Sequence, residues 1–461
     1  MITRGMFKAN DIRGIVGGDA AEWDETGARA IGAAYVELMN LAGEGFVLGR
    51  DMRVSGPQMS AAFADGARGA GADVIDAGLS STDQLWFDSG SMDLPGVQFT
   101  ASHNPPEYNG IKFCLPGAQP VTSDFITRLA DRAEEILASG ALPEADRQGT
   151  LSQVDTLDEY AQYLRSLVDT ANLRPLKVVV DAGNGMAGHT TRAVLEPLGV
   201  EIVGLYLDLD GNFPNHQPNP LIPENLVDAS KAVVEHGADL ALVFDGDADR
   251  CFIIDERGEV VTPSVVTALI AKAELTREPG STIVRNLITS DTVAEVVEEN
   301  GGKLVTSKVG HTMIKALMAE HDAIFGGEHS AHYYFRDFWG ADTGMLAALH
   351  VLALLGHQDR PLSELVTEFD RYAASGEINF TVADKPAAME AVASALRAKA
   401  AEEQWVDGLK LLGEGPRGTW WVSVRPSNTE PLLRLNVEAK DPQMMAALRD
   451  DVSDILAGFS S

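Results

Sequence analysis

An acidic stretch gives the clearest metal-binding pattern in the sequence. Asp245, Asp247 and Asp249 alternate in DGDADR, directly after the apolar run LALVF. Carboxylates spaced this closely repel one another, so a hard cation bound by all three explains the pattern better than a solvated acidic turn. The sixth position of an EF-hand loop requires glycine, and this chain has Arg250 there, which excludes that motif. Three carboxylates with room for a phosphate oxygen favour Mg²⁺.

A serine in a proline-stiffened loop is the candidate nucleophile. Ser102 lies in TASHNPP, after the apolar run GVQF. The prolines restrict the loop and give the hydroxyl a fixed place, but a serine still needs a base or a metal to become reactive. His103 beside it does not establish a catalytic pair, because neighbouring residues at a strand end often point apart. Taken alone, Ser102 is also compatible with an ordinary turn residue.

The stretch GEHSAH has the residue types of a sugar-binding loop. Glu328, Ser330 and His332 alternate, so they face one side if the segment is extended. A carboxylate and a hydroxyl together can bind neighbouring sugar hydroxyls. A zinc site formed by His329 and His332 is a weaker reading, since the spacing is not HExxH, and a purely structural loop is the other alternative.

The stretch RPSNTEP combines a guanidinium, hydroxyls, an amide and the N–H groups of a turn. These groups can bind a phosphate together, although a plain hairpin turn is the alternative. The candidate phosphate ligands are Arg425, Ser427, Asn428 and Thr429. Four groups elsewhere are weaker candidates, because each alone is typical of a surface charge: Arg13, Lys112, Lys308 and His311.

A glycine pattern suggests a different chemistry. Gly183, Gly185 and Gly188 match GxGxxG after an apolar run, and Asp208 follows 20 residues after the last of them. This spacing resembles a dinucleotide-binding fingerprint. Any tight strand-to-helix turn satisfies the same pattern, and a dehydrogenase leaves the acidic triad and the phosphate-binding stretch unexplained.

Strands and amphipathic helices must position these loops. Apolar runs alternate with segments whose apolar residues recur at three- and four-residue spacing, which predicts α/β domains with mixed or parallel sheets. After residue 370, one helical segment and two strands around RPSNTEP indicate a smaller α+β domain. Polar connections place the expected domains at residues 1–150, 151–254, 255–370 and 371–461.

The composition limits the classes of partner. The 461 residues include 36 Lys and Arg against 68 Asp and Glu, a net charge of −32. This balance argues against a nucleic-acid surface and against docking on anionic membranes, but a local cationic pocket can still bind an anionic small molecule. Two isolated cysteines, Cys114 and Cys251, favour a reducing compartment. The most apolar stretch, residues 344–356, is too short to span a bilayer, so we expect a soluble cytoplasmic protein.

Taken in this order, the four loops resemble the α-D-phosphohexomutase superfamily, and most closely its bacterial phosphomannomutases. The resemblance covers essentially the whole chain. It implies four domains around a central cleft, three similar α/β domains and a smaller C-terminal one. The implied activity is the interconversion of mannose 1-phosphate and mannose 6-phosphate, with the glucose phosphates as additional substrates. The reaction would use Mg²⁺, phospho-Ser102 and a hexose 1,6-bisphosphate, which is both intermediate and activator.

The resemblance also implies roles for individual residues. Ser102 would carry the phosphoryl group, and one of its phosphate oxygens would join the three aspartates as a metal ligand. Glu328 and Ser330 would bind the sugar, and the RPSNTEP loop would hold the non-reacting phosphate. Three residues would lie near the transferring proton and phosphoryl group, and the resemblance leaves open which of them moves the proton: Arg13, Lys112 and His332. Further substrate contacts are implied for His103, Arg250, Lys308 and His311.

Two departures from dual-specificity relatives favour mannose. This chain has Asn10 before DIRG, where those relatives have tyrosine, and GEHSAH in place of GEMSGH. The alternatives are a phosphoglucomutase or phosphoglucosamine mutase of the same superfamily, a magnesium-dependent sugar-phosphate phosphatase, and a non-catalytic binder. The expected partners are hexose phosphates, and the expected assembly is a monomer or a homodimer.

Overall fold

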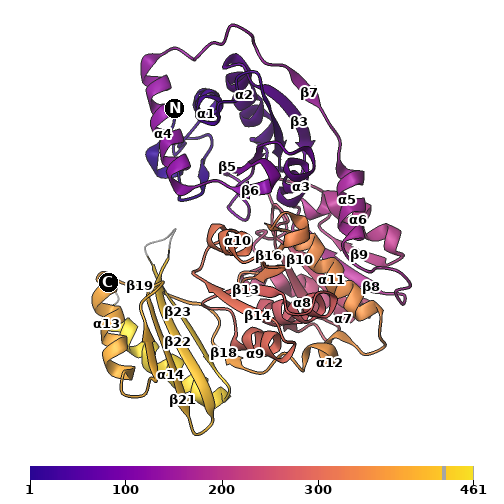
Figure 1. The fold of residues 1–461 in the computed structure, drawn as a ribbon, viewed down its shortest axis with the longest axis vertical. Coiled ribbons are helices and arrows are strands. Elements are labelled where there is room, and N and C mark those ends of the chain that lie inside the picture. The colour runs from indigo at the N-terminus through magenta and orange to yellow at the C-terminus, as the bar shows by residue number, and fades with distance from the viewer. Residues whose placement is uncertain (428–431, 460–461) are drawn as a thin grey trace.

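The computed structural model describes residues 1–427 and 432–459. Four β-sheets follow one another along the chain. The first lies at one end of the molecule, the second and third lie together, and the fourth lies to one side (Figure 1). This architecture confirms the expected fold class, three α/β domains with mixed sheets and a smaller α+β domain.

The first sheet has seven strands in the order β1-β5-β4-β2-β3-β7, with β6 paired to β5. Its helices α1 and α2 approach closely because Gly32 and Gly66 have no side chains; a Cβ at these positions would lie 2.1 Å from the Phe63 carbonyl oxygen and 1.9 Å from that of Arg29. The strands are β1 Asp11–Ile15, β2 Gly45–Arg50, β3 Asp73–Leu79, β4 Gly96–Phe99, β5 Tyr108–Leu115, β6 Gln119–Pro120 and β7 Leu151–Gln153. The helices are α1 Glu25–Met39, α2 Gly56–Gly69, α3 Thr82–Met92 and α4 Ser123–Ser139.

The second sheet has the order β12-β11-β10-β8-β9. Strands β8, β9 and β10 are parallel, and β11 returns antiparallel to β10. The loop between β10 and β11 therefore lies at the carboxyl ends of the parallel strands. The strands are β8 Lys177–Asp181, β9 Glu201–Leu205, β10 Leu240–Phe244, β11 Cys251–Asp255 and β12 Val260–Val261. The helices are α5 Leu157–Ser166, α6 Ala187–Leu195 and α7 Val227–His236.

The third sheet has the order β14-β13-β15-β16-β17 and is also mixed. The strands are β13 Thr282–Asn286, β14 Lys303–Ser307, β15 Phe325–Gly327, β16 Tyr333–Phe335 and β17 Ala341–Asp342. The helices are α8 Pro263–Arg277, α9 Asp291–Glu299, α10 His311–Glu320, α11 Gly344–Gly356 and α12 Leu362–Val366.

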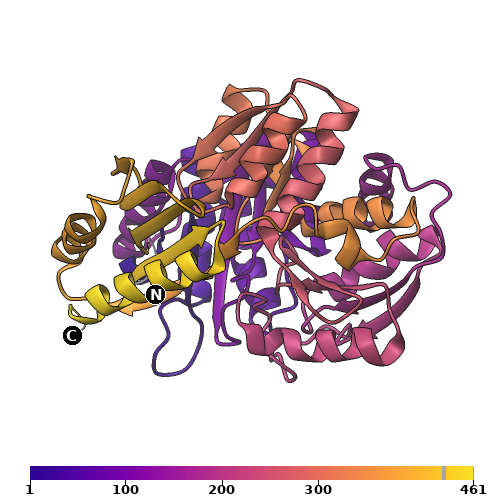
Figure 2. The same cartoon turned by 90° about the horizontal axis from the view of Figure 1, so that it is seen from below.

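The fourth sheet is antiparallel, in the order β18-β23-β22-β21-β20 with β19 paired to β23. Helices α13 and α14 pack against each other and against this sheet, and the view from below shows α14 lying along it (Figure 2). The strands are β18 Ala373–Ala374, β19 Ile378–Thr381, β20 Glu402–Gln404, β21 Leu409–Gly415, β22 Gly418–Pro426 and β23 Leu432–Ala439. The helices are α13 Lys385–Leu396 and α14 Pro442–Ala457.

The apolar cores explain which domains are tied together. One continuous core joins the second and third sheets and includes Leu85, Trp86 and Phe87 of α3, whereas the first and fourth domains each have a core of their own. Helix α11 is buried along almost its whole length within the shared core, as its apolar sequence predicts. Helix α3 is therefore a part of the first domain that packs into the neighbouring two.

Two strands lie close to the expected domain boundaries. Strand β7 pairs with β3 of the first sheet, and β12 pairs with β11 of the second. Both strands lie a few residues beyond the expected boundaries at 150 and 254, yet each pairs with the sheet before its boundary. The boundaries themselves stay predictions.

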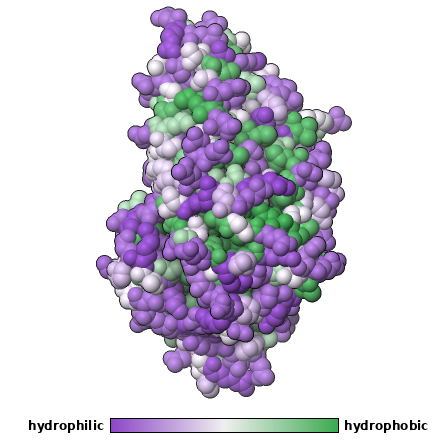
Figure 3. Space-filling view, turned by 90° about the vertical axis from the view of Figure 1, so that its right-hand side faces the viewer, coloured by the Kyte–Doolittle hydropathy of each residue, from purple (hydrophilic) through white to green (hydrophobic). Residues whose placement is uncertain are grey.

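The surface is mixed in character. In the space-filling view, hydrophilic residues cover most of one face and hydrophobic ones gather near its middle (Figure 3). Among the described residues, none of the helices combines the length and the apolar character needed to cross a bilayer.

Helix α3 contains a buried acid whose ionisation is expected to cost stability. Asp88 is fully buried, neither of its oxygens has a hydrogen-bond partner among the described residues, and burial raises its pKa to about 7. The folded protein therefore holds this proton more tightly than the unfolded chain, so ionisation destabilises the fold as the pH rises above the ordinary value near 4, with the full cost above 7.

We expect Asp88→Asn to stabilise the protein at pH 8 by about 4 kcal/mol, because each of the roughly three pH units between the two pKa values contributes about 1.4 kcal/mol. Below pH 4 both side chains are neutral and the difference should vanish. Urea unfolding at pH 4, 6 and 8 measures this effect. A variant no more stable than the unchanged protein at pH 8 would contradict the prediction.

Candidate functional site

The loop that follows β4 holds Ser102 in an unusual backbone conformation. Its φ is +50°, in the left-handed region that non-glycine residues seldom adopt. The Ser102 amide donates a hydrogen bond of 2.9 Å to the Thr100 hydroxyl, and the Asn104 amide donates one to the Ala101 carbonyl. The serine is 3 % exposed. Such strain persists where surrounding contacts determine it, and it is frequent at functional sites.

Arg53 supplies those contacts. Its guanidinium is buried and donates four hydrogen bonds of 2.7–2.9 Å to carbonyl oxygens of the same loop. The acceptors are Ser102, Asn104, Pro105 and Tyr108. One side chain from outside the loop therefore fixes its backbone, including the strained serine.

We expect Arg53→Met to lower the free energy of unfolding of the first domain by about 3–5 kcal/mol, the usual cost of removing one partner of a buried ion pair. Asp51, fully buried and 3.3 Å from the Arg53 guanidinium, would lose its counter-ion. Urea unfolding measures the loss. In the control Arg29→Met, a guanidinium that is 39 % exposed is removed, and the expected change is within about 0.5 kcal/mol. Equal effects of the two changes would contradict this role.

The acidic loop between β10 and β11 meets the serine. Asp245, Asp247 and Asp249 are buried, and each contributes an oxygen to a group whose members lie within 4.8 Å of one another. The Ser102 hydroxyl donates a hydrogen bond of 2.9 Å to Asp245. Gly246 allows this approach, because a Cβ there would lie 2.4 Å from the Ser102 carbonyl oxygen. The acidic triad is thus a metal-binding group beside the candidate nucleophile.

Buried carboxylate oxygens of the triad are available to a divalent cation, although cationic side chains also pair with the triad. The Lys112 ammonium lies 2.7 Å from Asp247 and 2.6 Å from Asp249, and these carboxylates outweigh burial and raise its pKa. Burial raises the pKa of Asp245 to about 7, although it pairs with Arg250. One oxygen each of Asp247 and Asp249 is buried without a hydrogen-bond partner among the described residues, as expected of groups available for a metal.

The expected sugar-binding loop connects β15 to β16. The carboxylate of Glu328 is buried and accepts hydrogen bonds from the Tyr334 hydroxyl at 2.6 Å and the Asn286 amide at 3.2 Å. The Ser330 hydroxyl lies 2.9 Å from Nδ1 of His332. Their mutual contacts show that all three expected side chains face the same side of the loop.

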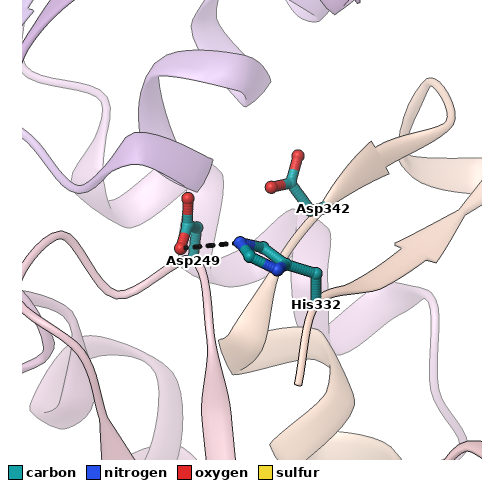
Figure 4. A group of neighbouring side chains, drawn as sticks. All are labelled: Asp249, His332 and Asp342. Carbon is teal, nitrogen blue, oxygen red and sulfur yellow. Dashed lines mark ion pairs between the residues drawn. The ribbon is translucent and has the colours of Figure 1, made fainter. Parts of the chain in front are cut away.

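His332 reaches from this loop to the metal-binding group. Its Nε2 lies 3.7 Å from an Asp249 oxygen, and its backbone forms a β-bridge with Arg250. Figure 4 shows the ring pointing toward Asp249, with the Asp342 carboxylate of β17 above it, and one ligand atom of each of the three residues lies within 4.8 Å of the other two. Asp342 is buried and pairs with Lys315 at 2.7 Å. The third domain thus places a histidine directly at the acidic loop of the second.

Arg13 and Arg250 contact the serine loop, and His103 lies within it. Arg13 donates to Asp11 at 2.8 Å and to the Asn104 side chain at 2.9 Å. Arg250 donates to Nδ1 of His103 at 2.7 Å. Burial and the Arg250 charge hold the pKa of His103 well below its usual value, so this ring is neutral and accepts the bond. His103 therefore positions Arg250 and is not itself a cation.

The expected phosphate-binding loop lies on the fourth domain. Arg425, at the end of β22, is buried and donates to Glu377 at 3.0 Å, and Arg434 pairs with the same carboxylate. Burial lowers the pKa of His329 in the sugar-binding loop, with opposing contributions from the Glu377 and Arg425 charges. Ser427 follows the strand. The remaining two expected ligands lie outside the described residues: Asn428 and Thr429.

A second loop of the third domain also approaches the fourth. Lys308 follows β14 and is exposed, and the neighbouring Val309 amide donates to Asp407 at 3.2 Å. His311 begins α10, and its side chain lies outside the described part of the structure. The loop that carries Lys308 thus contacts the C-terminal domain.

The structure brings together most of the residues singled out from the sequence. Linked by contacts around the acidic loop are Ser102, His103, Arg13, Lys112, Asp245, Asp247, Asp249, Arg250, Glu328, Ser330 and His332. Lys308 follows β14, Arg425 lies near the end of β22, and Ser427 follows that strand. These roles stay predictions.

Several contact residues carry no motif. Thr82 donates a hydrogen bond of 2.6 Å to Asp247 from 165 positions away in sequence. Arg53, Asn104, Asp342 and Glu377 likewise contact the predicted residues. Of these, only Asn104 lies in a motif visible in the sequence, the TASHNPP loop.

Comparison with known proteins identifies the family of all four domains. Three regions match the phosphoglucomutase/phosphomannomutase alpha/beta/alpha domains: residues 4–139 match domain I, 158–258 match domain II and 262–372 match domain III. Residues 377–455 match the C-terminal domain of the same family. The four domains occur once each and in order.

Full-length relatives agree. The chain is 39% identical over 451 residues to a phosphomannomutase of Escherichia coli K12, covering 96% of each, and 39% identical to the phosphohexose mutases of Xanthomonas campestris, covering 98% of this chain and 99% of that one. A crystal structure of a phosphoglucomutase/phosphomannomutase family protein from Burkholderia thailandensis superposes with a TM-score of 0.86 at 33% identity, covering 99% and 98% of the chains. The resemblance seen in the motifs is confirmed, and the chain belongs to the phosphoglucomutase/phosphomannomutase family.

Proposed function

We propose that the chain is a phosphohexomutase that interconverts mannose 1-phosphate and mannose 6-phosphate, with the glucose phosphates as additional substrates. The observation that carries this proposal is the Ser102 hydroxyl, held 2.9 Å from Asp245 within the acidic triad. A serine fixed beside a metal-binding group suits phosphoryl transfer, in which positioning and charge neutralisation supply most of the catalysis. The phosphomannomutase names of the full-length relatives support mannose as the preferred sugar.

The proposed cycle begins with phospho-Ser102. The free hydroxyl of a bound hexose monophosphate attacks phosphorus, the bond from phosphorus to the serine oxygen breaks, and the sugar proton passes to a base. The product, a hexose 1,6-bisphosphate, turns over within the site and returns its other phosphoryl group to Ser102. Mg²⁺ held by the three aspartates would neutralise charge on the transferring group. No atom is gained or lost in the cycle.

The surrounding side chains divide the remaining tasks. Arg13, Lys112 and His332 reach the acidic loop or the serine loop from three separate segments, and we assign proton transfer and charge stabilisation to this set. Arg250 contacts Asp245 from the loop's own end and His103 beside the serine, which suits a role in holding a phosphoryl oxygen.

The sugar and its second phosphate would be held from the other side. Glu328 and Ser330 present oxygens to sugar hydroxyls. Arg425 already binds a carboxylate, Glu377, and guanidinium groups bind phosphate with the same geometry. We place the second phosphate here, together with the loop residues Ser427, Asn428 and Thr429 and with Lys308 and His311 on the facing loop.

Phosphorus NMR tests the proposal. Purified protein is incubated with Mg²⁺, mannose 1-phosphate and a trace of hexose 1,6-bisphosphate as activator, and a parallel tube contains glucose 1-phosphate. We expect a growing 6-phosphate signal in both tubes, faster with mannose. Release of inorganic phosphate alone would identify a phosphatase, and unchanged spectra in both tubes would overturn the proposal.

We also propose a cytoplasmic location and a monomeric or homodimeric state. The structure records Cys114 and Cys251 as buried free thiols, which suits a reducing compartment. Sedimentation of the purified protein distinguishes the two assemblies.

A further inference from the structure

Asp83 joins three domains directly behind the acidic triad. This carboxylate is 1 % exposed and lies in the first turn of α3. It accepts a hydrogen bond of 2.7 Å from the Tyr160 hydroxyl of the second domain and one of 2.7 Å from the Thr343 hydroxyl of the third. Ser81, which caps α3, donates to its other oxygen. A single side chain thus connects elements that are 77 and 260 positions away along the chain.

The residue before Asp83 contacts the triad. Thr82 donates through its hydroxyl to Oδ2 of Asp247 at 2.6 Å, and through its backbone amide to the Asp247 carbonyl oxygen at 3.0 Å. Thr82 therefore holds both the side chain and the backbone of Asp247, and Lys112 donates to the same Oδ2 at 2.7 Å. A metal ligand whose second oxygen is held in this way keeps the remaining oxygen directed toward the metal.

Thr343, the hydrogen-bond partner of Asp83 in the third domain, also lies close to the site. Thr343 caps α11 by accepting from the Leu346 amide, and it follows Asp342, the carboxylate beside His332. The start of α11 packs on the Arg250 backbone, where a Cβ on Gly344 would lie 2.7 Å from the carbonyl carbon. The hydrogen bonds of Asp83 therefore lie next to the acidic loop and next to the segment that carries Asp342 beside His332.

We propose that Asp83 is a positioning residue for the metal-binding loop: by fixing the first turn of α3 against the second and third domains, it holds the Thr82 hydroxyl on Asp247 and so sets the affinity of the site for a divalent cation. This inference rests on the metal site of the proposed function but not on the identity of the sugar. Loss of such an outer partner typically weakens metal binding about 10–100-fold.

Direct binding of Mn²⁺, followed by electron paramagnetic resonance without substrate, tests the proposal. We expect Asp83→Asn to weaken Mn²⁺ binding about tenfold or more. The matched control is Asp88→Asn, which changes a second buried carboxylate five residues further along α3 and should leave the affinity unchanged. Equal affinities of the Asp83→Asn variant and the unchanged protein would overturn the proposal, as would an unchanged protein that binds no Mn²⁺.

A pair of Thr82 variants separates positioning from general stability. Thr82→Val, which removes the hydroxyl, should weaken Mn²⁺ binding as Asp83→Asn does, and Thr82→Ser, which keeps it, should restore near-normal binding. In the Thr82→Val background, adding Asp83→Asn should change the affinity less than twofold. Independent, multiplying losses in the double variant would show that Asp83 does not act through Thr82.

A milder variant protects the test against misfolding. Tyr160→Phe removes one donor to Asp83 and keeps the aromatic packing, so it should weaken Mn²⁺ binding by a smaller factor in a folded protein. An affinity that stays normal in this variant and in Asp83→Asn would overturn the inference. Absent mutase activity in a protein that shows all these binding changes would instead refute the proposed function alone.

Discussion

Ser102→Ala should abolish mutase turnover, with a loss on the order of 10⁴-fold or more, the scale seen when a catalytic nucleophile is removed. Without the hydroxyl, the site lacks the group that we propose carries the phosphoryl group between the two ends of the sugar. The fold should be unaffected, because Arg53 fixes the loop through backbone carbonyl groups that the substitution leaves in place. Phosphorus NMR with mannose 1-phosphate and the bisphosphate measures the loss.

Two further measurements define this result. Ser91→Ala makes the same chemical change at an exposed position of α3 and should keep full activity. Incubation with the bisphosphate should add the mass of one phosphoryl group to the unchanged protein and to the control, and none to the Ser102→Ala variant. Turnover near the normal rate in the Ser102→Ala variant would exclude a phosphoserine cycle.

The residues that do the chemistry of the site could be predicted from the sequence more completely than the residues that hold them in place. The alternation of Asp245, Asp247 and Asp249 after an apolar strand was enough to predict a metal-binding group, because a hairpin loop between two buried strands has few ways to place three carboxylates. The α/β fold class followed from alternating apolar strands and amphipathic helices. Both depend on local patterns, which a single sequence displays.

Contacts between remote elements were not predictable in the same way. Thr82 and Asp83 lie at a helix start that has no sequence motif. They reach Asp247 and Tyr160 only because α3 packs into a core shared by two other domains. Arg53 likewise has no motif, although it determines the backbone of the Ser102 loop. Nor does a turn pattern reveal that Ser102 has a positive φ.

The glycine pattern shows how a local signal can mislead. Gly185 and Gly188 are required by close backbone packing: a Cβ would lie 2.6 Å from the Gly246 carbonyl oxygen in the first case and 2.0 Å from that of Leu207 in the second. Gly185 therefore lets the β8 turn lie against the acidic loop. These contacts explain the glycines as a tight strand-to-helix turn, without a dinucleotide.

Asp247→Asn is expected to weaken divalent-cation binding by more than the 10–100-fold that loss of an outer partner costs, because it removes both a ligand charge and the residue that Thr82 positions. The Lys112 ammonium outweighs burial and holds the pKa of Asp247 well below its usual range, so this ligand is ionised throughout the working pH range. Titration with Mn²⁺ and the dependence of turnover on Mg²⁺ both measure the effect. Asp208→Asn, the same change at an exposed position of the second domain, should alter neither, and matching effects of the two substitutions would contradict a metal site at the triad.

Chelation should then stop turnover without unfolding the protein. Lys112 bridges Asp247 and Asp249, and Arg250 pairs with Asp245, so the carboxylates retain counter-charges when a chelator removes the metal. We expect the activity lost in a chelator to return on addition of Mg²⁺, with little change in the urea midpoint. A large fall in that midpoint would mean that the metal ion holds the loop together. It would contradict the expectation that Lys112 and Arg250 alone neutralise enough of the triad's charge.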